Sequence, residues 1–98
     1  MSMKENAVFR RGEDFPFQNL EDQIVLVQPA LRAVHLMNGP AARIWELLEK
    51  EITLPAIVET LTREYDVPED QAQREGAAFL GELEENQLVS IQPRKAGK

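Results

Sequence analysis

Residues Val34–Trp45, VHLMNGPAARIW, decide the fold, because the chain changes there from an extended segment to a helix. Arg32–Met37 alternates and is rich in apolar side chains, which predicts a strand. Asn38 stands where a helix N-cap belongs, and Pro40 follows in the first turn, where its missing N–H costs nothing. Apolar residues then recur with the spacing of one helix face: Ala41, Ile44, Trp45 and Leu48. Almost no linker separates strand from helix, so the angle between them is fixed.

The segments before this junction predict further strands. Ile24–Gln28 is a β-branched run with apolar residues on both faces, which favours a central strand. Pro29-Ala30-Leu31 turns the chain, so that Arg32–Met37 returns antiparallel and completes a hairpin. Phe15–Leu20 predicts one more strand, in which Pro16 favours a sheet edge or an irregular start.

Three helices are predicted after the junction. The first covers Pro40–Lys50, and Thr53 caps the second. The apolar face of the second helix comprises Leu54, Ile57, Val58, Leu61 and Tyr65. The third helix starts after Pro68, and its apolar face comprises Ala72, Gly76, Phe79, Leu80 and Leu83. Leu88–Ile91 predicts a wing strand. The expected fold is α+β and winged helix-turn-helix-like, an N-terminal three-stranded antiparallel sheet followed by a three-helix bundle.

Length and composition place this chain among small single domains. Its 98 residues suit one domain, which we expect at residues 1–92, with flexible tails at 1–14 and 93–98. The net charge of −6 argues against nucleic acid or an anionic membrane as partner. The chain has no cysteine, no apolar run near the ~20 residues of a membrane span, and no secretory signal pattern. We expect a cytoplasmic protein.

The sequence offers little of the chemistry that an enzyme needs. His35 is the one histidine, and it lies on the strand face opposite Val34 and Leu36, where packing is the favoured role. No metal-binding HExxH, nucleophile elbow or phosphate-binding glycine loop occurs. We therefore expect no catalysis, no cofactor and no metal site.

Two binding functions remain open at this point. A winged helix suggests a DNA-binding regulator, but the third helix has one base among six acids, which phosphates would repel. The other function uses the hairpin, whose last strand leaves backbone N–H and C=O groups unpaired if it lies at the sheet edge. An extended peptide can add there as a further strand. The N-terminal segment or a second copy of the chain would compete for the same edge.

A resemblance favours the peptide. Phe15–Val89 resembles the PqqD family, coenzyme PQQ synthesis protein D, whose members are also called RiPP precursor peptide recognition elements. The similarity lies in the hairpin IVLVQPALRAVHLMN, the junction LMN-x-P-A-A-x-I-W-E-L-L from Leu36 to Leu48, the helix TLPAIVETLTREYDV and the ending FLGELEENQLV.

The resemblance implies a non-enzymatic adaptor without a cofactor. Such proteins capture the leader segment of a ribosomally made precursor peptide and present the peptide to a modifying enzyme, often a radical SAM enzyme. The leader pairs with the third strand beside the third helix, which implies two sets of contact residues here. The strand set is Leu31, Arg32, Ala33, Val34, His35 and Leu36, and the helix set is Glu75, Ala78, Phe79 and Glu82. A structural subunit that docks on a larger enzyme is the remaining alternative, and an open edge also permits a homodimer.

Overall fold

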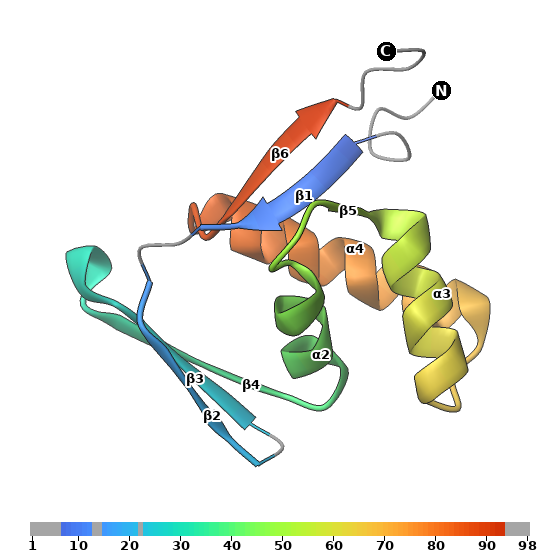
Figure 1. Cartoon of the computed structure of the whole chain (residues 1–98), viewed down its shortest axis with the longest axis horizontal. Coiled ribbons are helices and arrows are strands. Elements are labelled where there is room, and N and C mark those ends of the chain that lie inside the picture. The colour runs from blue at the N-terminus through green and yellow to red at the C-terminus, as the bar shows by residue number, and fades with distance from the viewer. Residues whose placement is uncertain (1–6, 13–14, 22, 94–98) are drawn as a thin grey trace.

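The structure is a computed structural model and describes residues 7–12, 15–21 and 23–93. Its elements, in chain order, are β1 (Ala7–Arg11), β2 (Phe17–Leu20), β3 (Gln23–Gln28), the 3₁₀ turn η1 (Pro29–Leu31), β4 (Ala33–Asn38), α2 (Pro40–Leu47), β5 (Ile52–Thr53), α3 (Leu54–Glu64), α4 (Glu69–Glu85) and β6 (Val89–Pro93). The predicted α+β order of strands, three helices and a wing strand is confirmed. The described strands, however, form two sheets, β2-β3-β4 and β5-β1-β6 (Figure 1).

The sheet β2-β3-β4 is an antiparallel meander that packs one face on the helices. Ile24 and Leu26 of β3 are fully buried, whereas Val25 between them is only half-buried. The rings of Phe17 on β2 and Trp45 on α2 meet edge to face, with their centroids 5.9 Å apart. This contact and the buried apolar residues of β3 hold the sheet against α2.

The second sheet corrects the expected N-terminal tail. β1 lies within residues 1–14, which we expected to be flexible, yet it pairs with both β5 and β6. Ala7 and Phe9 are 3% and 2% exposed, because alternate side chains of β1 reach the core. β6 also extends to Pro93. Gly12, which follows β1, donates its N–H to the Leu88 carbonyl at 2.9 Å. Residues 1–6, 13–14 and 94–98 of the two expected tails lie outside the described residues.

The two longer helices start and pack as predicted. Thr53 caps α3 through its Oγ1, which accepts a hydrogen bond from the Ala56 N–H at 3.3 Å. The buried residues of α4 are Ala72, Gly76, Leu80 and Leu83. A Cβ on Gly76 would lie 3.3 Å from a methyl group of Leu54, so this glycine allows α4 to approach α3 closely. None of the described helices combines the length and the apolar character that crossing a membrane requires.

The junction between β4 and α2 differs from the prediction in one respect. Asn38 was expected to cap the helix, but it is the last residue of β4, and Gly39 is the N-cap. Gly39 has a φ of +58°, a conformation that suits glycine and that turns the chain within one residue. β4 can therefore continue through Asn38, and α2 ends at Leu47, before the predicted Lys50.

Candidate functional site

β4 lies at the edge of its sheet. Among the described residues it pairs only with β3, in a register that places His35 opposite Leu26. Leu31 and Arg32, which we expected in this strand, instead belong to the turn. Leu31 ends η1, and Arg32 has a φ of +54° and donates its N–H to the Pro29 carbonyl at 3.0 Å. The predicted strand set is therefore reduced to Ala33, Val34, His35 and Leu36 within β4.

The register identifies which backbone groups of β4 point away from β3. The Val27 N–H donates to the Pro16 carbonyl at 2.9 Å, so the polar backbone groups of Val27 face β2. In an antiparallel sheet successive residues direct these groups to opposite sides, so those of Leu26 face β4. His35, opposite Leu26, then directs its own groups back to β3. Val34 and Leu36 therefore present N–H and C=O groups at the outer edge.

The side chains of β4 divide between two faces. His35 lies on the inner face with the buried Met37, as the alternation predicted, and it is half-buried. Val34 and Leu36 lie on the outer face, where 67% and 62% of each residue is exposed. Two residues whose outward backbone groups pair with no other described strand thus carry exposed apolar side chains.

A chain of hydrogen bonds connects β4 to the end of α4. His35 Nε2 lies 2.9 Å from Gln28 Oε1, and Gln28 Nε2 donates to the Asn86 carbonyl at 2.6 Å. The Asn86 side chain in turn donates to the Glu82 carbonyl at 3.0 Å. Because Gln28 uses its NH₂ group on Asn86, its oxygen accepts from the imidazole, which places a proton on Nε2. This chain fixes the spacing between the edge strand and the helix.

Sequence reasoning missed the part played by Gln28. It is 4% exposed and follows Ile24 and Leu26 at the alternation of the buried face. A polar side chain at a buried position requires hydrogen-bond partners. The sequence signal that could have revealed this role is a glutamine at the next alternate position after Ile24 and Leu26, on the face of the strand that is buried.

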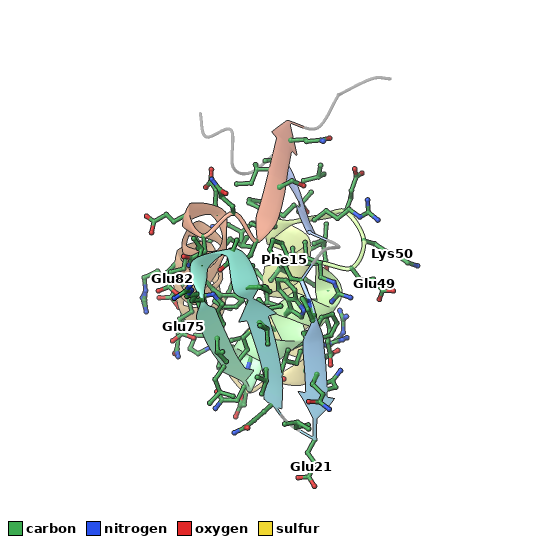
Figure 2. All side chains as sticks on the ribbon, turned by 90° about the vertical axis from the view of Figure 1, so that its left-hand side faces the viewer. Phe15, Glu21, Glu49, Lys50, Glu75 and Glu82 are labelled. Atoms are coloured by element: carbon green, nitrogen blue, oxygen red, sulfur yellow. The ribbon has the colours of Figure 1, made fainter. Side chains whose placement is uncertain are left out.

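The predicted helix set lies along one flank of α4. Glu75, Ala78 and Glu82 are exposed, whereas Phe79 is half-buried and packs on the core. Glu75 and Glu82 project on the side of the molecule where β4 ends the sheet, as Figure 2 shows. The structure thus brings Glu75 and Glu82 of the helix set to the side of the molecule on which β4 lies.

Arg11 and a hollow beside it form a second surface feature, away from the β4 edge. Arg11 is half-buried although its side chain is charged. Its Nη1 donates to the Trp45 carbonyl at 2.9 Å, and its guanidinium carbon lies 4.8 Å from the centre of the Phe17 ring. An open hollow of about 440 Å³ adjoins it, next to β2 and away from the β4 edge. Within the described residues, no cluster of three His, Cys, Asp or Glu side chains suits a metal ion.

Comparison with known proteins relates the chain to peptide-binding proteins. Residues 23–89 match the family described as PqqD, Coenzyme PQQ synthesis protein D. None of the curated proteins compared with the chain matches it.

Two solved structures have a similar fold. "TbiB1 in Complex with the TbiA(beta) Leader Peptide" is 23% identical, with a TM-score of 0.74, over 83% of this chain and 94% of that chain. "Lasso peptide synthetase B1 complexed with the leader peptide" is 26% identical, with a TM-score of 0.72, over 84% of this chain and 96% of that chain. The family match covers about two thirds of the sequence, and this chain belongs to the PqqD family.

Proposed function

We propose that this chain is a non-catalytic adaptor that binds the leader segment of a ribosomally made precursor peptide as an added strand on β4. The observation that carries the proposal is the outer edge of β4, where Val34 and Leu36 present backbone N–H and C=O groups beside α4. Both similar solved structures are complexes with leader peptides, which supports the same role here.

Backbone hydrogen bonds and side-chain contacts contribute differently to recognition of the peptide. The edge groups of β4 provide hydrogen bonds that any extended peptide can make, and the neighbouring side chains select the sequence. A leader that is disordered in solution is ordered on binding, and this entropic cost keeps the affinity modest. The adaptor then presents the precursor to a modifying enzyme, for which a radical SAM enzyme is our candidate.

The DNA-binding alternative has no support in the structure. α4 is the helix that would enter the major groove, and it carries six acids and one base: Glu69, Asp70, Glu75, Glu82, Glu84, Glu85 and Arg74. Phosphates would repel this surface.

A proline at the edge tests the proposal. The probes are labelled synthetic peptides that tile the short reading frames beside the gene, and fluorescence anisotropy measures their binding. At least one peptide should bind the wild-type chain. Val34→Pro removes an outward N–H and should lower the affinity for that peptide at least about tenfold. A hydrogen bond to the peptide is lost, and the proline ring occupies the place of the donor hydrogen.

Val34→Ala is the matched control, because it shortens the same side chain and keeps the N–H. It should bind better than Val34→Pro, with circular dichroism showing that both variants are folded. Equal binding by the two variants would show that the peptide does not pair with β4, and absence of binding by every peptide would refute the adaptor role.

A second copy of the chain would use the same backbone groups as the peptide. Edge-to-edge dimers and peptide complexes therefore exclude each other. If the free chain sediments as a β4-paired dimer, saturating peptide should convert it to a monomer, whereas a dimer that persists with bound peptide must use another surface.

A further inference from the structure

A strand added to β4 would direct its side chains in two chemically different directions. Residues opposite Val34 and Leu36 would exchange backbone hydrogen bonds with them and point to the outer face of the sheet. Residues opposite Ala33 and His35 would point to the inner face, beside α4. Every second residue of the guest thus meets one environment, and the intervening residues meet the other.

The outer face of the sheet carries no charge. The residues of the three strands that point to it are Gln18, Leu20, Gln23, Val25, Val27, Val34, Leu36 and Asn38. Val34 lies opposite Val27, and Leu36 lies opposite Val25, so apolar side chains form adjacent cross-strand pairs. In a chain with 29% charged residues, such a face favours apolar or β-branched neighbours on the next strand.

The flank of α4 that faces the guest's other side is acidic. Glu75 and Glu82 are seven residues apart and therefore share one helix face, with Ala78 and Phe79 between them. The carbonyl of Asn86, one turn beyond Glu82, accepts a hydrogen bond from the Gln28 side chain, which places the Glu82 end of this flank next to the hairpin. Glu75 projects on the same side of the molecule (Figure 2). Glu75 accepts a hydrogen bond from the uncharged Gln71 side chain at 3.1 Å. Arg74, the one base of α4, points about 100° away from Glu75.

From these two environments we infer that the chain selects a peptide with a two-residue alternation. Apolar or β-branched residues occupy every second position and face outward beside Val34 and Leu36. Lysine or arginine occurs among the intervening residues and faces Glu75 and Glu82. The inference rests on the proposed strand addition, and it specifies the class of peptide that this site accepts.

Selection from a random library tests the pattern. A phage library of random peptides of about twelve residues is selected on the immobilised full chain, and each enriched clone is tested on Val34→Pro and Val34→Ala. Clones that bind Val34→Ala but not Val34→Pro should show apolar residues at alternate positions, with bases enriched and acids depleted between them. Acids between the apolar positions, or no alternation, would overturn the inference and leave strand addition standing. If no clone is sensitive to Val34→Pro, strand addition itself fails.

Charge reversal provides a second test with a synthetic peptide from the selection. The double variant Glu75→Lys/Glu82→Lys should bind the basic peptide about tenfold more weakly than wild type, as expected for two partly exposed charge pairs. It should also prefer a version of the peptide in which the bases are changed to glutamate. The control Glu51→Lys/Glu84→Lys changes the net charge equally at exposed positions away from this flank.

The control variant distinguishes an effect of Glu75 and Glu82 on peptide binding from an effect of the net charge of the protein. Only the variant at Glu75 and Glu82 should invert the preference between the two peptides. An equal effect of both double variants would assign the preference to net charge and overturn the role of this flank.

Discussion

Oε1 of Gln28 lies 2.9 Å from Nε2 of His35, and this contact joins the buried face of the central strand to the edge strand. The same glutamine side chain reaches the Asn86 carbonyl at the end of α4. One amide group therefore connects three elements, β3, β4 and α4, and two of them form the candidate peptide site. The geometry of the candidate peptide site therefore depends on the buried Gln28 amide as well as on the surface residues.

We expect Gln28→Leu to reduce both stability and peptide binding. The substitution leaves the Asn86 carbonyl and the His35 imidazole without their partner, and a buried unsatisfied group costs about 1–3 kcal/mol of unfolding free energy. Urea unfolding measures the loss. Gln18→Leu is the matched control, because it makes the same change at an exposed position of β2 and should alter stability by less than about 0.5 kcal/mol. Equal losses in the two variants would show that the hydrogen-bond chain contributes nothing.

The ion pair between Arg43 and Glu64 should make stability depend on pH. Arg43 donates from Nε and Nη2 to the two carboxylate oxygens of Glu64, at 2.8 and 3.0 Å. These hydrogen bonds lower the pKa of Glu64 below its ordinary value of 4.5. The unfolded chain then binds a proton more readily than the folded chain, so this contribution is present above pH 4.5 and disappears as the pH falls through the lowered pKa.

Urea midpoints of wild type and Glu64→Gln test this dependence. The wild type should have the higher midpoint at pH 7, and the difference should shrink steadily below pH 4.5. Glu59→Gln is the control, because Glu59 forms a longer contact of 3.6 Å with Arg63 and both side chains are more exposed. A difference that stays constant down to pH 2 would exclude the charge of Glu64 as its cause.

Patterns local in the sequence predicted the elements well. The β-branched run of β3, the cap at Thr53 and the proline before α4 each act through neighbouring residues, and each was confirmed. The edge position of β4 was a hypothesis that the register supports. The division of the strands into two sheets was not predicted, because the pairing of β1 with β5 and β6 joins residues more than 40 positions apart.

The errors at the ends of β4 have a common origin. Arg32 and Gly39 both have positive φ angles. The first keeps Arg32 out of the strand, which begins at Ala33, and the second makes Gly39 the helix cap in place of Asn38, although the helix begins at Pro40 as predicted. Arginine rarely adopts this conformation, so no residue type marked the turn at Arg32. For the same reason Leu31 and Arg32 lie outside the strand in which we expected them, whereas Ala33 to Leu36 lie within it. Whether any of these six residues contacts a peptide stays a prediction. The contacts of the helix set with a peptide stay a prediction.

The register also predicts how proline scanning of β4 affects stability. His35 directs its N–H to Leu26 on β3, whereas Val34 directs its N–H to the outer edge. His35→Pro removes a ladder hydrogen bond and its donor, and Val34→Pro removes none within the domain. His35→Pro should therefore lower the unfolding free energy by at least about 1 kcal/mol more than Val34→Pro.

His35→Ala corrects for loss of the imidazole contact to Gln28, and Val34→Ala corrects for loss of the valine side chain. If proline at the two positions costs the same after these corrections, the outward direction assigned to the Val34 N–H is wrong, and a peptide on β4 would have to pair with His35 instead.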